Sequence, residues 1–130
     1  MSSQIDQLLK LKTWAIVGLS NNKERAAFDV AKLLIEKGHT VIPVHPKAET
    51  VHGQTGYAKL SDIPLSVDVV DIFVNSDLAG DVVNEAIEIG AKGVWLQLDV
   101  IDTAAIARAQ EAGLLAVMNH CPAIEYKKRN

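Results

Sequence analysis

Short apolar runs alternate along this chain with longer segments in which apolar residues recur every three or four positions. A continuous apolar run is typical of a parallel strand covered on both faces, and the longer period is typical of an amphipathic helix. Five strands are therefore expected, at Trp14–Val17, Thr40–Val44, Val67–Val74, Gly93–Gln97 and Leu114–Met118. Helices are expected at Ile5–Lys10, at Phe28–Lys37, at Asp77–Ile89, and from an N-cap at Thr103 to Ala112.

This alternation predicts an α/β fold, with a single Rossmann-like, doubly wound parallel sheet of about five strands and helices on both faces. A crossover after the first two strands suggests the strand order 3-2-1-4-5. The chain has 130 residues, of which 48% are hydrophobic, so residues 1–130 are expected to form a single domain with its own core. Ligands of such a sheet bind outside the carboxyl ends of the strands, near the point at which the strand order reverses.

The composition excludes several classes of protein. A formal net charge of −3 argues against a general nucleic-acid binder, which needs a basic face. No apolar stretch approaches the roughly 20 residues of a membrane span, and the N-terminal residues show neither a signal nor a transit pattern. The single cysteine, Cys121, permits no intrachain disulfide. We therefore expect a soluble cytoplasmic protein that binds neither nucleic acid nor membrane, with Lys127–Arg129 as a solvated tail.

The first strand ends at Gly18 and passes through a short polar turn into the next helix, as in phosphate-binding sites. The first amides of that helix lack partners within it, and the helix dipole adds a partial positive charge. In the turn, Ser20 and Asn21 can form hydrogen bonds, and Lys23 and Arg25 can neutralise phosphate. Because the GxGxxG and Walker patterns are both absent, a turn with solvent-facing cations remains the alternative.

Two further strand ends carry candidate ligand contacts. Val44, His45 and Pro46 stand where a dinucleotide site has an acidic residue for the ribose hydroxyls, so NAD is not expected. His45 and Pro46 contact a nucleotide there or simply reverse the chain. After the third strand, Asn75 can touch the ligand, cap the following helix, or do both.

Groups suited to catalysis are scattered. The four histidines are dispersed, and none has metal-ligand spacing with the cysteine, so no metal is expected. His120 and Cys121 are neighbours, and neighbouring side chains on a strand point in opposite directions, which argues against a Cys–His nucleophile pair. By the same reasoning Asp68 and Asp71 face opposite sides and form no carboxylate pair. We therefore predict no catalytic residues.

Several segments together resemble a known family. They are WAIVGLS, VAKLLIEKGHTVIPVHP, VDVVDIF, EAIEIGAKGVWLQL and AGLLAVMNHCPAIEY, and they lie between about Leu11 and Tyr126. They are similar to the small stand-alone CoA-binding proteins, which are single-domain relatives of the CoA-binding domain in succinyl-CoA synthetases and in nucleoside-diphosphate-forming acyl-CoA synthetases. VWLQL and MNHCPAIEY are the most specific segments. The resemblance implies coenzyme A as the ligand, bound across the strand ends.

The resemblance also implies a place for each part of coenzyme A. The pyrophosphate would lie on Gly18, Ser20, Asn21, Lys23 and Arg25. The adenine end would lie near Val44, His45 and Pro46, with Phe73, Val74 and Asn75 opposite. Gln97, Cys121 and Pro122 would lie toward the pantetheine.

This chain departs from the family's pattern in four places. Val74-Asn75 follow Phe73 where an arginine is usual, His45 replaces an asparagine, Asp99 replaces a glycine, and Asn119-His120 replace an acidic-basic pair. Loss of the arginine removes a contact to the 3′-phosphate of the ligand, which is expected to weaken CoA binding or to change the ligand.

We predict a protein that binds coenzyme A or an acyl-CoA and has no catalytic machinery of its own, since 130 residues leave no room for the synthetases' additional domains. Two alternatives remain open. One is a small enzyme that handles acyl-CoA or exchanges thiols through Cys121 or His120, and the other is a CoA or redox sensor that acts through a protein partner. A homodimer also remains open.

Overall fold

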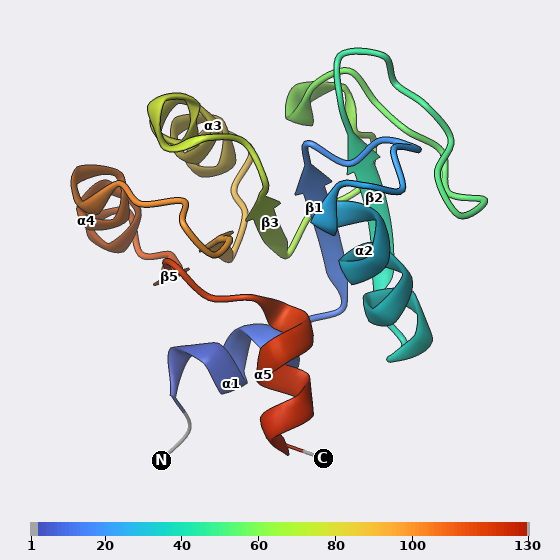
Figure 1. Ribbon diagram of the computed structural model, residues 1–130. Coiled ribbons are helices and arrows are strands. Elements are labelled where there is room, and N and C mark those ends of the chain that lie inside the picture. Colours follow the sequence, from blue (N-terminus) through green and yellow to red (C-terminus); the bar gives the residue numbers. More distant parts are fainter. Residues whose placement is uncertain (1–2, 130) are drawn as a thin grey trace.

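The computed structural model describes residues 3–129, which form one parallel sheet with helices on both faces (Figure 1). The strands are β1 (Thr13–Val17), β2 (Thr40–Val44), β3 (Val69–Ile72), β4 (Gly93–Leu96) and β5 (Leu115–Val117). The helices are α1 (Gln4–Leu9), α2 (Ala26–Glu36), the 3-10 helix η1 (Leu60–Asp62), α3 (Ser76–Glu88), α4 (Thr103–Glu111) and α5 (Pro122–Arg129). The predicted α/β class and the five parallel strands are confirmed.

The strand order is β2-β1-β3-β4-β5, so the third strand lies beside β1 and not beyond β2, which corrects the predicted order 3-2-1-4-5. The outer edge of β2 is occupied by Tyr57, whose N–H donates to the Pro43 carbonyl at 3.0 Å and whose carbonyl accepts from the His45 N–H at 3.0 Å. Pro43 has no N–H for a further strand, which suits β2 to an edge. The reversal of strand order therefore falls between β1 and β3.

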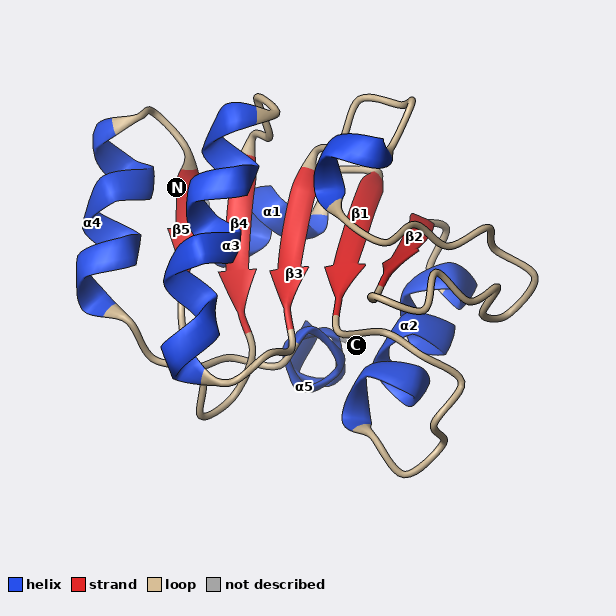
Figure 2. Ribbon diagram, turned by 90° about the horizontal axis from the view of Figure 1, so that it is seen from above, coloured by secondary structure: helices blue, strands red, loops and turns tan. Residues whose placement is uncertain are grey.

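The helices lie on both faces of the sheet (Figure 2), and an apolar layer fills the space between the sheet and the helices on each face. On one face, α1, α2 and α5 cover a core that includes the fully buried Trp14 and Trp95, whose ring centroids are 5.6 Å apart. On the other face, α3, α4 and η1 cover a core of smaller side chains such as Val70 and Val94. No helix within residues 3–129 is both long and apolar enough to cross a membrane.

The C-terminal basic run is exposed to solvent, as predicted, but it belongs to α5 and is therefore not a loose tail. Arg129 donates to Asp6 of α1 at 2.6 Å and to Glu125 at 3.1 Å, and Glu125 also pairs with His120 and Lys128. Burial raises the pKa of Glu125, but the hydrogen bonds from Arg129, His120 and Lys128 outweigh it, so the pKa lies below its ordinary value. Cations in the last turn also suit the helix dipole, so α5 is tied to α1 by charge.

The ends of the four predicted helices differ from the observed ones by one or two residues, and the cap of α4 is an example. The N-cap of α4 is Asp102, whose side chain accepts from the Ala105 N–H at 3.0 Å, and Thr103 is the first helical residue. Both residue types suit an N-cap, so their neighbouring positions leave the sequence ambiguous by one residue.

Candidate functional site

The carboxyl edge, at which the five strands end, faces the viewer in Figure 1. The exits of three strands meet there. The Gly18 N–H donates to the Val44 carbonyl at 2.8 Å, and a Cβ added to Gly18 would lie 3.2 Å from the Phe73 Cβ. Gly18 has φ +99°, which favours glycine. The structure thus brings together three predicted ligand residues, Gly18, Val44 and Phe73, where the strand order reverses.

The loop after β1 packs against the loop after β2. The Asn21 N–H donates to the Glu49 carboxylate at 3.0 Å, and the Asn21 side-chain amide donates to the Thr50 carbonyl at 2.9 Å. The Ser20 hydroxyl accepts from the Asn22 N–H at 3.3 Å. Of the predicted phosphate contacts, Ser20 and Asn21 therefore already have protein partners, and Glu49 is an acidic residue that the sequence analysis did not place at this site.

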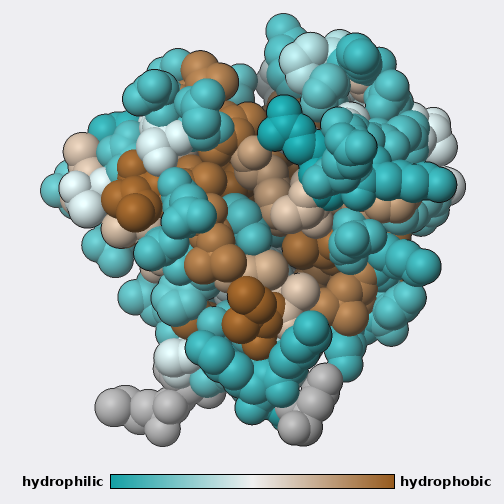
Figure 3. All heavy atoms as spheres, in the orientation of Figure 1, coloured by the Kyte–Doolittle hydropathy of each residue, from teal (hydrophilic) through white to brown (hydrophobic). Residues whose placement is uncertain are grey.

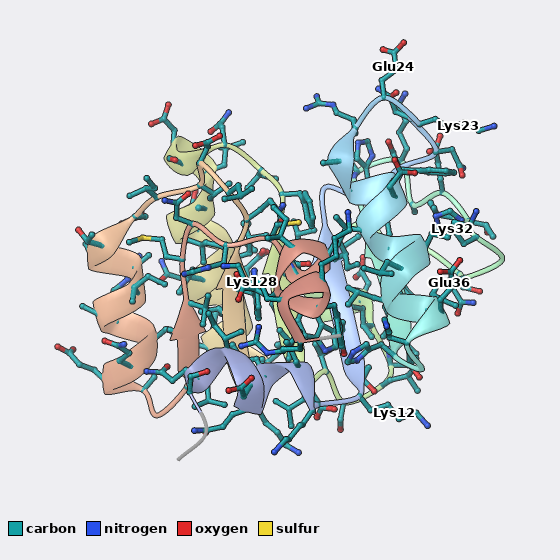
Figure 4. All side chains as sticks on the ribbon, turned by 60° about the horizontal axis from the view of Figure 1, so that its bottom comes forward. Lys12, Lys23, Glu24, Lys32, Glu36 and Lys128 are labelled. Carbon is teal, nitrogen blue, oxygen red and sulfur yellow. The ribbon has the colours of Figure 1, made fainter. Side chains whose placement is uncertain are left out.

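The start of α2 differs from the starts of α1, α3 and α4. Those three helices are capped by the side chains of Ser3, Asn75 and Asp102, whereas Arg25, the N-cap residue of α2, makes no side-chain capping bond. Apart from the Phe28 N–H, which bonds to the Arg25 carbonyl at 3.1 Å, the first amides of α2 and the exposed Arg25 guanidinium are therefore available to an anion. Lys23 points away from the body of the molecule at the tip of the same loop (Figure 4).

His45 and Pro46 lie at the end of β2, beside this loop. The His45 ring nitrogen Nδ1 accepts from the Lys47 N–H at 3.2 Å, and its carbonyl accepts from the Ala48 N–H at 2.7 Å. The bonds close a turn, so the chain-reversal interpretation of His45 and Pro46 is confirmed, and ligand contact remains a prediction. Exposed Lys47 adds a cation here that the sequence analysis did not assign to the ligand, although it directly follows Pro46.

Asn75 caps α3, because its side-chain oxygen accepts from the Leu78 N–H at 3.3 Å. Of the two roles weighed for Asn75, capping is therefore confirmed, and ligand contact stays a prediction. Val74, just before it, is half-buried and packs against the core under α3.

The loops after β3, β4 and β5 are linked by hydrogen bonds. The Ser76 hydroxyl accepts from the Ile101 N–H at 2.9 Å and donates to the Asp99 carbonyl at 3.3 Å. The Asn119 side chain accepts from the Asp99 N–H at 2.8 Å. Asp99 and Asn119 have φ of 67° and 62°, a conformation that Asp and Asn tolerate better than most residues. This accounts for Asp99 at a position where the resemblance leads one to expect glycine.

Gln97, Cys121 and Pro122 lie close to one another, since the His120 N–H donates to the Leu96 carbonyl at 3.4 Å. All three are buried. The Gln97 side-chain oxygen is buried and has no hydrogen-bond partner among the described residues. His120 and Cys121 lie beyond β5, so the argument that neighbouring side chains on a strand point in opposite directions does not apply to them and was wrong. The two side chains are nevertheless apart, because the His120 ring pairs with Glu125 at 3.3 Å and Cys121 packs into the core.

Asp68 and Asp71, both predicted in the third strand, have different surroundings, and only Asp71 lies within β3. Asp68 precedes β3 and pairs with Lys92 at 3.4 Å, whereas Asp71 is fully buried and both of its carboxyl oxygens lack a partner among the described residues. Burial raises the pKa of Asp71 well above its ordinary value. Residues 3–129 contain no cluster of three or more His, Cys, Asp or Glu side chains that could hold a metal ion.

A cavity of about 310 Å³ lies at the opposite edge of the sheet, where the strands begin. Its lining includes Lys10, Lys12, Lys37, His39 and Tyr126. Two of these lining residues are hydrogen-bonded to each other, since the His39 ring and the Tyr126 hydroxyl are 2.5 Å apart. None of the predicted ligand residues lines it, and open α/β sheets bind their ligands at the carboxyl ends of their strands. The candidate site is therefore the carboxyl edge.

Comparison with known proteins gives a family and several relatives. The model of the CoA binding domain family matches residues 12–127. A hypothetical protein from Pyrococcus horikoshii OT3 has a solved structure with 42% identity and a TM-score of 0.90, covering 95% of this chain and 88% of that one. YneT of Bacillus subtilis (strain 168) is 28% identical over 120 residues, which are 92% of this chain and 89% of YneT. Trans-feruloyl-CoA synthase FCS1, from an unknown prokaryotic organism, is 26% identical over 115 residues, 87% of this chain but 16% of that protein.

Proposed function

This chain belongs to the CoA binding domain family, and we propose that it binds coenzyme A at the carboxyl edge of its sheet without catalysing a reaction. The observation that carries the proposal is the match over residues 12–127, which includes all five strands and every predicted ligand residue. The relative named as a trans-feruloyl-CoA synthase supports the same ligand, because its name implies a CoA thioester.

The pyrophosphate of coenzyme A is proposed to lie at the start of α2. Free helical amides and the exposed Arg25 supply hydrogen bonds and charge there, and Gly18 lets the ligand approach the backbone. Lys23 and Lys47 flank the position and can turn toward the phosphates. The Glu49 carboxylate already accepts from the Asn21 N–H. A bound phosphate therefore either makes no bond to this N–H or displaces the Glu49 carboxylate from it.

The adenine end is proposed to lie beside Val44, His45 and Pro46, with Phe73, Val74 and Asn75 on the other side of the crevice. The pantetheine arm is proposed to run toward Gln97, whose side-chain oxygen lacks a partner among the described residues and would turn outward to accept from an amide N–H of the arm. Binding without chemistry is supported by the surroundings of Cys121 and His120. The thiol packs into the core and the ring pairs with Glu125, which leaves this His–Cys pair unsuited to nucleophilic catalysis.

Calorimetric titration with coenzyme A, ADP and NAD tests the proposal. Coenzyme A should bind most tightly, because no carboxylate directly follows Val44 to hold ribose hydroxyls, Glu49 is already held by the Asn21 amide, and the α2 start suits several phosphates. Arg25→Ala should weaken coenzyme A binding by about 1.5–3 kcal/mol, the range for a hydrogen bond to a charged group. The matched control is Lys32→Ala, which removes the same charge from the exposed side of α2 (Figure 4). Binding should also weaken as salt rises.

Two results would contradict the proposal at different levels. Tighter binding of NAD than of coenzyme A, or no binding of coenzyme A, would overturn the ligand assignment. Equal effects of Arg25→Ala and Lys32→Ala would keep the ligand but remove Arg25 from the phosphate site, leaving the helix amides and the two lysines.

A further inference from the structure

Four large apolar side chains are exposed on the half of the carboxyl edge that is formed by β3, β4 and β5. They are Leu78, Leu98, Ile101 and Ile124, each more than 40% exposed, and they are called the apolar patch here. In Figure 3, which has the orientation of Figure 1, apolar surface runs across the middle of this face between α3 and α4 on one side and α2 and α5 on the other. Exposed apolar surface that gathers in one place at a ligand-binding edge calls for an occupant.

The segments that carry the patch are held against one another. The bonds of Ser76 to Asp99 and Ile101 join the start of α3 to the loop after β4, and the bond between Asn119 and Asp99 joins that loop to the exit of β5. Each patch residue lies within a few positions of this hydrogen-bonded group. The patch is therefore preformed, so a ligand need not order loops in order to bind it.

The position of the patch relative to the α2 start points to its occupant. With about 4.8 Å between neighbouring strands, β5 lies about 14 Å from β1 along the edge. A ligand that sets its phosphates at the start of α2 extends its other arm along this edge and brings its far end to β4 and β5. We propose, resting on the proposed coenzyme A site, that the apolar patch binds the acyl chain of a CoA thioester, and that this chain is apolar and uncharged.

The charges around the patch define the class of acyl group. Residues 74–79, 97–103 and 119–124 include Asp77, Asp99 and Asp102 but no lysine or arginine, and the ring of His120 faces Glu125. Asp102 has the Arg108 guanidinium nearby, since both lie within 3.3 Å of the Cβ position at Gly80, but a second carboxylate at the end of a dicarboxylic acyl chain would still meet the like charges of Asp77 and Asp99. The site is therefore built for aliphatic or aromatic acyl groups and against succinyl-type ones.

The same charges argue against a second copy of the chain as the occupant. In a twofold dimer a surface patch meets itself, so the three aspartates of one copy would face those of the other. A stable interface also involves about 20–30 residues a side, whereas the patch offers four large apolar side chains. An acyl chain fits both the size and the charge of the patch.

Titration calorimetry with coenzyme A, butyryl-CoA, octanoyl-CoA and succinyl-CoA tests the inference. Each methylene that the patch covers should tighten binding about twofold to fourfold, and succinyl-CoA should bind no better than coenzyme A. Ile101→Ser and, separately, Leu98→Ser should reduce the ratio of the coenzyme A and octanoyl-CoA dissociation constants. Leu65→Ser, which alters an exposed leucine in the segment that leads into β3 at the opposite edge, should leave that ratio unchanged.

The outcomes separate the two proposals. If coenzyme A binds and octanoyl-CoA binds no tighter, or if the advantage of the acyl chain survives both patch substitutions, the acyl site is overturned and the coenzyme A site stands. If none of the four compounds binds, both are overturned. A dimer in light scattering that Ile101→Ser dissociates and Leu65→Ser does not would assign the patch to a second copy and overturn the acyl site. Thermal unfolding of each variant verifies its fold, and the exposed positions make folding of all three variants the expected result.

Discussion

Asp71 should make this protein less stable as the pH rises. The residue lies in β3 between Ile16 and Trp95 of the neighbouring strands, on the face covered by α1, α2 and α5, and it is fully buried without a hydrogen-bond partner within the described chain. A charge at this position would lack both water and a counter-ion. The folded protein therefore keeps the carboxyl protonated, and burial raises its pKa well above the ordinary value of 3.8.

The sign of the effect follows from the protons that each state binds. Above about pH 3.8 the unfolded chain releases the Asp71 proton, whereas the folded chain retains it until the pH reaches the raised pKa. Across that window the folded state binds one more proton, so the free energy of unfolding falls by about 1.4 kcal/mol for each pH unit. Asp71→Asn has nearly the same shape and carries no titrating proton. The free energy of unfolding of the variant, relative to that of the wild type, should thus rise by about 1.4 kcal/mol for each pH unit across this window.

Urea unfolding at a series of pH values from 4 to 8 measures this difference. The free energy of unfolding is plotted against pH for each protein, and the wild-type curve is subtracted from the variant curve. The subtraction cancels the contributions of all other titrating groups, because Asp71→Asn leaves those groups unchanged. Asp81→Asn, an exposed aspartate of α3, serves as the control for removal of one carboxyl group. Parallel wild-type and Asp71→Asn curves would refute the reasoning, because they would mean that Asp71 titrates alike in the folded and unfolded states.

Two further predictions concern Gly18 and Cys121. Gly18→Ala should destabilise the protein by about 1–3 kcal/mol in urea unfolding, because its φ is +99° and the new Cβ would lie 3.2 Å from Phe73. Gly38→Ala has a similar φ of +96° but open space around the Cβ, so equal losses in the two variants would show that the approach to Phe73 contributes nothing. Cys121 is 8% exposed, so mass spectrometry should find that the folded protein reacts with CoA disulfide far more slowly than the urea-unfolded chain does. Rapid formation of one mixed disulfide per native chain would instead favour the thiol-exchange and sensor alternatives.

The five strands, the first four α-helices and the start of the site could be predicted from the sequence because they depend on local patterns, whereas α5 was not predicted. The apolar runs predicted the five strands, and the position of Gly18 between a strand and a helix predicted the turn at which three strand ends meet. The capping role of Asn75 followed from its place just before a helix. The family resemblance found in the sequence was confirmed by the match over residues 12–127.

What only the tertiary structure decided depends on contacts between distant parts of the chain. Tyr57, and not the third strand, occupies the outer edge of β2, and the third strand lies beside β1. Pro43, which has no N–H to donate, is a sequence feature that fits this order. Arg129 becomes part of a packed helix through Asp6, 123 positions earlier. The burial of Asp71 and the contact of Asn21 with Glu49 likewise depend on which segments meet. Local sequence patterns determine whether a segment forms a helix or a strand. Strand order, burial and side-chain pairing depend instead on which distant segments pack together, and the spacing of residues along the sequence does not specify which segments these are.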